Sequence, residues 1–292
     1  MQRARPRERG FQLALVAPSI FVLLLIGVFP LVYLVVVSFQ NITMTDVDTS
    51  FQGLLNYQLM FADRRLWEAL LHTGVFMVIA LPVELLLGLA MAQLFIEHIP
   101  GRAVFVALLV LPVLVSPIVA GATWSLMFDN RFGPINQILG WFAGEPVAML
   151  WTIRSNLVYP AILIAEIWQW TPFMFLLLLA ALAGVDKSQL EAAAIDGASW
   201  WRTFRLIVLP AIWPVMAVAI LIRALDLFRL FDIVWALTKG GPGTMTETVS
   251  MFAYVKGFQQ FETSYVAAVS LILIVMLSAI VLWTLKRVAL SR

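Results

Sequence analysis

The sequence of 292 residues contains no cysteine, which excludes disulfide bonds and any chemistry that needs a thiol. Histidine is also scarce: only His72 and His98 occur, and they form no candidate metal cluster or histidine-based catalytic triad. Charged residues make up 12% of the chain, whereas an ordinary globular domain has about 25%. The net charge of +2 is too small to favour binding to nucleic acid. These absences argue against a soluble enzyme or a nucleic-acid-binding domain.

Long apolar runs fill the sequence instead. Hydrophobic residues make up 62% of the chain, and the mean hydropathy is +0.94. A membrane-spanning helix needs about 20 mostly apolar residues. We therefore predict an all-α, polytopic membrane protein with one transmembrane domain over residues 1–292. Its six predicted transmembrane helices cover residues 11–39, 68–95, 103–128, 158–183, 208–237 and 264–285.

The orientation of these spans follows from the lysines and arginines between them, which are commoner on the cytoplasmic side. With the N-terminus inside, the inner segments hold eleven of these residues and the outer segments hold six. Both termini are therefore predicted to be cytoplasmic. The first apolar run is too long for a signal peptide and is interpreted as a retained span. One outer segment, from Asp129 to Asn156, is predicted to hold a short helix at the membrane interface.

The inner segment 184–207 has the pattern of two short helices. Asp186 or Ser188 can cap the start of the first helix, and Gly197 permits the left-handed turn that ends it. The second helix is predicted from about Ser199 to Leu206. Small residues would let a partner approach the first helix closely, while Glu191 and Asp196 could orient that partner through charge. The alternative interpretation is an amphipathic helix that rests on the membrane surface.

This segment resembles the motif shared by the membrane subunits of bacterial binding-protein-dependent ABC importers. The family pattern is Glu-Ala-Ala, three residues, Gly, nine residues, Ile, one residue and Leu-Pro. The chain matches it throughout with Glu191-Ala192-Ala193, Gly197, Ile207 and Leu209-Pro210. The resemblance implies a type I ABC importer permease fold, in which this loop is a coupling helix seated in a separate ATPase subunit. Its candidate coupling residues are Glu191, Ala192, Ala193, Asp196 and Gly197.

Other stretches narrow the resemblance to sugar permeases of the maltose type, and to the first of the two permeases in such systems. They are Pro18-Ser19, Pro30 with Ser38-Phe39, Asn56-Tyr57 with Phe61, Arg223–Asp226 with Phe231-Asp232, and Leu237–Gly243 with Thr246–Thr248. The chain lacks the additional N-terminal spans and the large periplasmic insertion of maltose permease itself, so it resembles the shorter six-span members.

The resemblance also implies a set of partners in the bacterial plasma membrane. They are a second, homologous permease, two ATP-binding subunits and an extracytoplasmic solute-binding protein. The chain has no Gly-x-x-x-x-Gly-Lys-Ser/Thr phosphate loop, so we do not expect it to hydrolyse ATP. ATP and Mg²⁺ are expected on the ATPase partner, and this chain is expected to hold no cofactor.

Ionisable residues inside predicted spans are costly and by default indicate a functional site. They are Glu84, Glu166, Arg223, Asp226, Arg229 and Asp232. In one interpretation, Arg223 with Asp226 and Arg229 with Asp232 neutralise each other locally, because each pair is three residues apart on a helix.

The other interpretation places a solute site on two helix faces. Glu166, Trp170 and Phe173 form a stripe at helical spacing, and Arg223 and Asp226 share a face on which Arg229 and Asp232 do not lie. Charged groups can bond to sugar hydroxyls while aromatic rings pack on the sugar, and the resemblance implies that these faces line the solute cavity. We therefore predict these five residues as solute contacts.

Four acids against two arginines favour a neutral sugar or polyol as the solute. Arg223 keeps an anionic derivative, such as glycerol phosphate or a sulfonated sugar, as an alternative. A secondary transporter that uses the buried acids to carry protons is a further alternative, but it leaves the 184–210 segment unexplained.

Overall fold

The computed structural model describes residues 6–43, 46–97 and 99–290, so the predictions that involve Arg3, Arg5, His98 and Arg292 fall outside the described residues. The chain divides into two compact units. The first contains the described residues up to Arg64 together with Ala253–Ser278, and the second contains Arg65–Phe252 and the segment that begins at Ala279. The single transmembrane domain remains a prediction.

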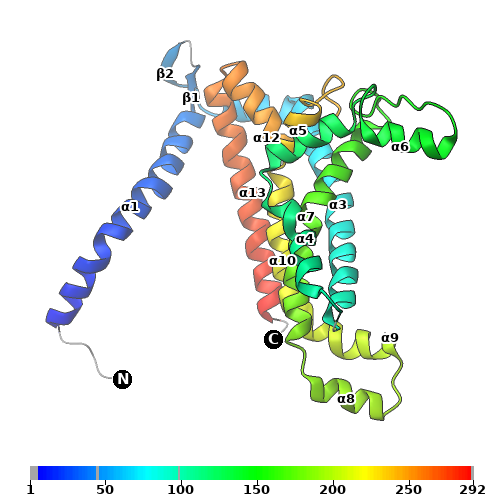
Figure 1. The fold of residues 1–292 in the computed structure, drawn as a ribbon. Helices are drawn as coiled ribbons and strands as arrows, with labels where there is room; N and C mark the ends of the chain where they lie inside the picture. The colour runs from blue at the N-terminus through cyan, green and yellow to red at the C-terminus, as the bar shows by residue number, and fades with distance from the viewer. Residues whose placement is uncertain (1–5, 44–45, 98, 291–292) are drawn as a thin grey trace. The chain divides into compact units, whose positions relative to one another are not determined.

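The first unit is built from two long helices and the segments next to them (Figure 1). Helix α1 (Pro6–Ser38) leads into the antiparallel strands β1 (Gln40–Ile42) and β2 (Val47–Phe51), followed by helix α2 (Leu55–Ala62). Asn56 on α2 donates hydrogen bonds to the carbonyls of Ser38 and Gln40, at 3.0 and 2.9 Å, and so satisfies backbone groups where α1 ends. The π-helix η2 (Val255–Gln259) and the start of α13 (Thr263–Leu290) complete this unit. The Ser264 hydroxyl accepts a hydrogen bond from the Ile42 amide at 2.8 Å.

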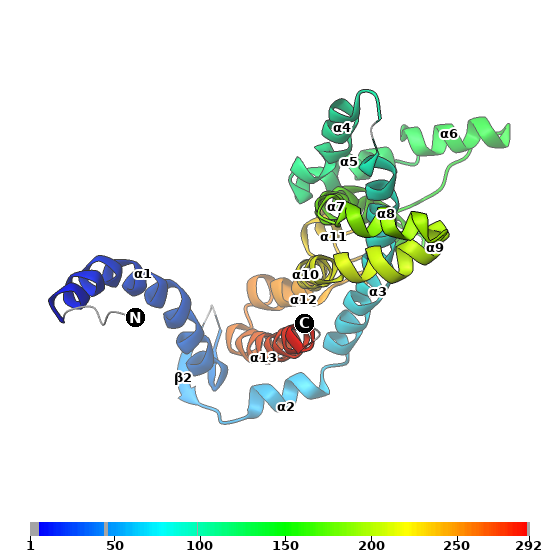
Figure 2. The ribbon, with the colours of Figure 1, turned by 90° about the horizontal axis from the view of Figure 1, so that it is seen from below.

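The regular secondary structure of the second unit is helical in all of its described residues, and loops connect the helices. Its helices are α3 (Arg64–Ile96), α4 (Arg102–Leu114), α5 (Pro117–Met127), α6 (Pro134–Ala143), α7 (Val158–Ala183), α8 (Lys187–Ile195), α9 (Trp200–Thr203), the π-helix η1 (Phe204–Val208), α10 (Leu209–Phe228), α11 (Asp232–Leu237) and α12 (Val249–Tyr254). Helix α7 is the most buried of the long apolar helices, and α3, α4, α10 and α11 surround it in the view along its axis (Figure 2). Its Phe175 and Leu178 pack in one apolar core with residues of α3 and α10. The second unit is thus organised around α7.

A close approach between α3 and α7 depends on Gly88. A Cβ atom at this position would lie 2.6 Å from the Met174 Cβ and 2.8 Å from the Phe175 backbone nitrogen, and real Cβ atoms essentially never come so near. Only glycine therefore fits between the two helices. Glu84 lies one helical turn before Gly88, so the same contact brings its carboxylate toward the centre of the unit.

Five helices among the described residues are long and apolar enough to cross a membrane, or six if α4 and α5 count as one broken span. The prediction of one continuous helix over 103–128 is wrong, because α4 and α5 meet at an angle of 97°. Ser116 precedes Pro117 and has an extended backbone with ψ of 136°, as expected of a residue before proline. The Gln169 side chain of α7 donates a hydrogen bond of 2.7 Å to the Val115 carbonyl, which satisfies one backbone group at the break.

The predicted span 208–237 also ends early. Helix α10 stops at Phe228, and the backbone turns before α11 starts at Asp232. The Thr248 hydroxyl donates a hydrogen bond of 2.6 Å to the Leu230 carbonyl in this turn. A residue 18 positions away thus stabilises the end of the span, which no local pattern in the sequence indicates.

Candidate functional site: a charged cavity and an exposed helical loop

A cavity of about 240 Å³ lies where α5, α7, α10 and α11 meet. Four of the five predicted solute contacts line it, namely Glu166, Trp170, Arg223 and Asp226. Its other lining residues are Pro117, Arg229, Leu230, Phe231, Asp232 and Ile233. The breaks after α4 and after α10 both contribute to the cavity, because Pro117 begins α5 and residues 229–231 connect α10 to α11. The two interruptions of the helices therefore shape the site.

Arg223 is the centre of a buried ion cluster. Its Nε and Nη2 donate hydrogen bonds of 2.7 and 2.9 Å to the two carboxylate oxygens of Glu84 on α3. Its Nη2 also donates to Glu166 on α7. All three residues are at most 2% exposed. A buried charge persists only when it is paired and hydrogen-bonded, and this bidentate geometry meets that requirement.

The local pairing of Arg223 with Asp226 is therefore wrong, and so is that of Arg229 with Asp232. Arg229 instead pairs with Asp226 at 2.8 Å, and both of these side chains reach the cavity. The expectation that Arg229 and Asp232 lie on another face also fails, because both line the same cavity. The physical reason is the end of α10 at Phe228, beyond which the helical periodicity no longer places side chains.

Aromatic rings complete the cavity wall. The guanidinium carbon of Arg223 lies 4.6 Å from the centre of the Trp170 ring, within the range of a cation–π contact. Phe173 meets Trp170 edge to face, with ring centres 6.3 Å apart, and is not among the residues that line the cavity. Phe173 thus supports the ring that reaches the cavity.

Three buried side-chain oxygens of α7 have no hydrogen-bond partner in the described structure. They are Oε2 of Glu166, Oε1 of Gln169 and Oγ1 of Thr171. Of these three residues, Glu166 lines the cavity, and its carboxylate oxygen is an acceptor. Unsatisfied buried acceptors are rare in folded proteins, so a molecule that brings hydrogen-bond donors would be stabilised here.

The loop between α7 and α10 forms the two predicted short helices. Asp186 caps α8, because its carboxylate accepts a hydrogen bond of 2.9 Å from the Ser188 amide, and this bond lowers the pKa of the Asp186 carboxyl. Gly197 has a φ of +66°, which confirms the left-handed turn at the end of α8. The Ala198 amide closes this turn by donating to the Ala193 carbonyl at 2.9 Å. The second helix begins after Ser199, as predicted, but becomes the π-helix η1 at Phe204.

The two short helices project beyond one end of α7 and α10 (Figure 1). Glu191, Ala192 and Asp196 are exposed, whereas Ala193 is buried at 7% exposure. A groove of about 510 Å³ between α8 and α9 is lined by residues that include Ala192, Asp196 and Arg202. The loop therefore offers small and charged side chains to a partner, while Ala193 supports the helix from within.

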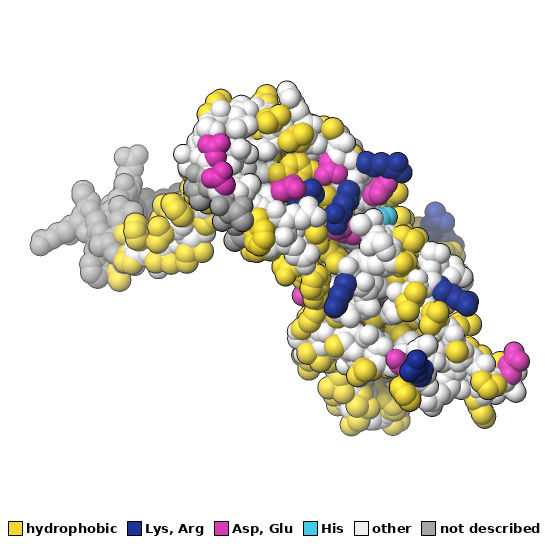
Figure 3. Space-filling model, turned by 90° about the horizontal axis from the view of Figure 1, so that it is seen from above, with side chains coloured by type: hydrophobic (Ala, Val, Ile, Leu, Met, Phe, Trp, Pro, Cys, Tyr) yellow, Lys and Arg dark blue, Asp and Glu magenta, His cyan; other side chains and the backbone are white. Residues whose placement is uncertain are grey.

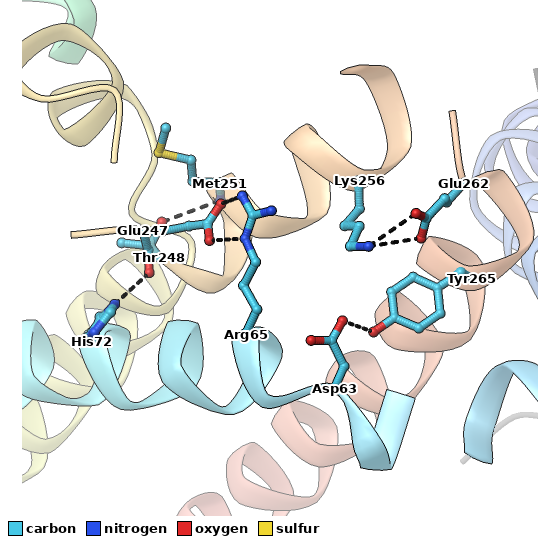
Figure 4. Close-up of polar contacts among 9 residues, drawn as sticks. All are labelled: Asp63, Arg65, His72, Glu247, Thr248, Met251, Lys256, Glu262 and Tyr265. Carbon is cyan, nitrogen blue, oxygen red and sulfur yellow. Dashed lines mark hydrogen bonds and ion pairs between the residues drawn. The ribbon is translucent and has the colours of Figure 1, made fainter. Parts of the chain in front are cut away.

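At the opposite end of the second unit, the segment Thr246–Val249 is tied to α3 (Figure 4). Arg65 donates hydrogen bonds of 2.7 and 2.8 Å to both carboxylate oxygens of Glu247. The Glu247 carbonyl lies 3.1 Å from Nδ1 of His72, and the Thr73 hydroxyl accepts from the Val249 amide at 2.9 Å. Since Thr248 holds the Leu230 carbonyl, this segment connects α3 to the cavity wall.

The end of the second unit that contains the segment Thr246–Val249 carries charged side chains of both signs. Figure 3 shows Lys and Arg side chains beside Asp and Glu side chains there, with apolar side chains between them. Helix α6 confirms the short helix predicted between Asp129 and Asn156, and its Trp141 and Phe142 are more than two-thirds exposed. In the first unit, Lys256 pairs with Glu262 at 3.1 Å and Tyr265 donates to Asp63 at 2.7 Å (Figure 4).

A profile of the family described as "Binding-protein-dependent transport system inner membrane component" matches residues 59–289. The chain belongs to this family. It is therefore a multi-pass inner-membrane permease of a transport system and not a catalytic subunit. The match includes both the charged cavity and the loop with α8 and α9, and it confirms the family that the motif from Glu191 to Pro210 indicates.

Several characterised or named permeases are similar along most of their length. The trehalose/maltose transport system permease protein MalF of Thermococcus litoralis is 36% identical over 248 residues, which cover 85% of this chain and 83% of the relative. The trehalose transport system permease protein SugA of Mycobacterium tuberculosis is 33% identical over 271 residues, covering 92% and 86%. The sulfoquinovosyl glycerol transport system permease protein SmoG of Agrobacterium fabrum is 31% identical over 271 residues, covering 91% and 86%.

The permease fold also matches a solved structure. A chain of a bacterial ABC transporter involved in the import of the acidic polysaccharide alginate superposes with a TM-score of 0.82 at 20% identity, covering 97% of this permease and 96% of that chain. This likeness confirms the predicted type I importer fold.

Residues that contact the cavity wall from outside were missed by the sequence-based prediction. Glu84 was recognised as a costly charge in a span, but nothing in the sequence identified its partner on α10. Thr248 and Glu247 belonged to a recognised motif without an assigned contact. The buried acid in an apolar helix was the one available signal, because it requires a cation from another helix.

Proposed function

We propose that this permease is one of two membrane subunits of an ATP-driven importer and lines half of the path for a neutral sugar or polyol. The relatives named above transport trehalose, maltose and a sugar glycerol, according to their names. The observation that carries the proposal is the cavity in which Glu166, Trp170, Arg223 and Asp226 meet between the helices. Its acceptor oxygens suit the hydroxyl groups of a sugar, and the Trp170 ring suits the apolar face of a sugar ring.

In the proposed transport cycle, α8 docks into a groove of an ATP-binding subunit. Two such subunits would bind ATP and Mg²⁺ and hydrolyse the nucleotide, while this chain contributes no cofactor. The exposed Glu191, Ala192 and Asp196 would contact the partner, with Gly197 setting the end of the docking helix. Closure of the ATP-binding subunits would move α8 and α9, and η1 passes that movement directly to α10 and its cavity.

The remaining partners complete the path. A second, homologous permease would form the other half, and an extracytoplasmic binding protein would deliver the solute to the outer end. The proposed location is the bacterial plasma membrane with both termini in the cytoplasm, which places α8 and α9 on the side of the ATP-binding subunits.

A second candidate solute is an anionic sugar derivative. Two observations favour it: Arg229 lines the cavity with its side chain 69% exposed, and one relative is named for sulfoquinovosyl glycerol, a sulfonated sugar derivative. The charge balance of the cavity favours the neutral solute, because four acids lie in or behind the cavity with only two arginines.

The test is solute-stimulated ATPase activity of the complete complex in lipid, with the binding protein, the second permease and the ATP-binding subunits present. Stimulation by a neutral sugar, lost in Glu191→Lys and in Asp226→Ala but retained in the exposed control Glu97→Lys, is the expected result. Stimulation by anionic sugars alone would favour the second candidate solute, the anionic sugar derivative. Solute movement without any ATP-binding subunit would refute the importer proposal.

A further inference from the structure

The charge of the cavity depends on a residue that does not line it. Glu84 is fully buried on α3, is absent from the cavity wall, and binds Arg223 from behind through both carboxylate oxygens. Arg223 does line the cavity. A solute in the cavity therefore meets a guanidinium group whose positive charge is already compensated.

The sum of charges supports this description. With both carboxylates ionised, the cluster of Arg223, Glu84 and Glu166 carries one negative charge. If one carboxyl group holds a proton, the cluster is neutral. The neighbouring Asp226–Arg229 pair adds nothing to the sum, and Asp232 adds a further negative charge. The summed charge is thus negative in both of these states, although two arginines are in the cavity wall.

We infer that Glu84 is a specificity-determining residue, which makes this half of the path reject anionic solutes by compensating Arg223 from outside the cavity. Glu166 would bind the neutral solute, because it lines the cavity and its Oε2 has no hydrogen-bond partner among the described residues, so a solute hydroxyl that reaches this oxygen can donate to it. This inference rests on the proposed function and adds to it the residue that sets the preference for a neutral solute. The substrate class is accordingly a polyhydroxylated solute without an anionic group.

Because Glu84 is buried, its charge should have a large effect on the affinity of the cavity for an anionic solute. A unit charge acts more strongly across a few ångströms of protein interior than across water, because the effective dielectric constant is lower. When Glu84 is ionised, removal of its charge makes the cavity more positive by one unit without changing the residues that line it. An anionic solute should gain affinity, while a neutral solute of the same shape should change little.

The experiment measures equilibrium binding to the assembled complex in lipid nanodiscs without the binding protein, so that the selectivity of the binding protein does not intervene. The probes are the neutral sugar that stimulates the wild-type ATPase most, with maltose tried first, and the uronate obtained by oxidising one of its primary hydroxyls. The quantity compared is the ratio of the uronate affinity to the neutral-sugar affinity. The variants are Glu84→Gln, Asp232→Asn and the control Glu97→Gln, which removes an exposed negative charge outside the cavity.

We expect the wild type to prefer the neutral sugar and Glu84→Gln to raise the affinity ratio by about tenfold or more. Asp232→Asn should also raise the affinity ratio. If Glu84→Gln does not assemble, Asp232→Asn tests whether the charge of the cavity sets the ratio, because the Asp232 side chain is exposed and its substitution should not prevent assembly. Glu97→Gln should leave the ratio unchanged. A wild type that prefers the uronate, or assembled variants with the wild-type ratio, would overturn the inference and leave the proposed importer function intact. A wild-type ATPase that no sugar stimulates would refute the proposed function instead.

Discussion

Arg223 on α10 and Glu84 on α3 lie 139 residues apart in the chain and share two hydrogen bonds of 2.7 and 2.9 Å. The pair crosses the interior of the second unit and reaches Glu166 on α7 through the same guanidinium group. Three separate helices are thus joined at one buried point beside the cavity. This arrangement gives the cluster a structural role in joining the helices and a role in selecting the charge of the solute. The two roles can be tested separately.

The structural role of the ion cluster predicts that Arg223→Met strongly destabilises the complex. The substitution leaves Glu84 and Glu166 buried without a counter-charge, and breaking a buried pair typically costs about 3–5 kcal/mol. Thermal unfolding of the purified complex should show a large decrease in Tm. The control is Arg229→Met, because Arg229 is exposed and its ion pair contributes about 1 kcal/mol or less. Equal Tm values for the two variants would contradict the buried cluster.

Gly88→Ala should separate α3 from α7. The added Cβ atom would lie 2.6 Å from the Met174 Cβ, and overpacking of this kind costs about 1–3 kcal/mol. We expect a lower Tm together with weaker solute binding, since Glu84 lies one turn away. Gly74→Ala is the matched control on the same helix, because a Cβ atom there meets nothing within 4 Å. A neutral effect of Gly88→Ala would show that the helices are not in close contact.

Gly197→Ala should disturb the end of α8. Gly197 has a φ of +66°, and a residue with a Cβ atom adopts this conformation at a cost of roughly 1 kcal/mol. We expect reduced stimulation of ATPase activity by solute with no loss of complex assembly. Gly197→Asn should retain more stimulation than Gly197→Ala, since asparagine tolerates the left-handed region better. The opposite order of the two variants would count against the backbone explanation.

Thr248→Val should weaken the connection between the segment Thr246–Val249 and the cavity wall. The hydroxyl donates to the Leu230 carbonyl and accepts from the Met251 amide, and both partners are buried. Leaving buried polar groups unsatisfied costs about 1–3 kcal/mol, so Tm and transport should both decrease. Thr123→Val serves as the control, because the Thr123 hydroxyl bonds only to a carbonyl of its own helix and is exposed. Indistinguishable variants would exclude a role for this connection.

The cap of α8 predicts a specific dependence on pH. The Ser188 amide lowers the pKa of the Asp186 carboxyl below its ordinary value of 3.8, so the stabilisation is complete above that value and is lost as the pH falls through the lowered pKa. Hydrogen exchange of α8, corrected for intrinsic rates, should therefore show constant protection from about pH 5 to 8. Asp186→Ala should reduce the protection across this range, and Asp186→Ser should retain part of it. Wild-type protection in Asp186→Ala would mean that the cap does not stabilise the helix.

Most of the helical organisation could be predicted from the sequence. The spans at 68–95, 158–183 and 264–285 correspond closely to α3, α7 and α13, because length and hydropathy are sufficient to identify a membrane helix. The ends of α8 were equally predictable, since Asp186 and Gly197 act through hydrogen bonds and dihedral angles within a few residues. The spacing from Glu191 to Pro210 identified the family for a similar reason, as it is a local property of the chain.

The charged cavity required the tertiary structure. The sequence showed six ionisable residues in apolar surroundings, and the local rule of pairing three residues apart gave the wrong partners for Arg223. A buried arginine binds the carboxylates that helix packing brings to it, and that packing depends on distant features such as Gly88 against Met174. The break at Val115 and the end of α10 at Phe228 depend in the same way on Gln169 and Thr248, which lie 54 and 18 residues from their partners. Local composition identifies which segments are helices and which charges need partners, so these features are predictable from the sequence. Which charges meet and where the helices break depend on contacts between residues that are far apart in the chain, so these features follow only from the folded arrangement.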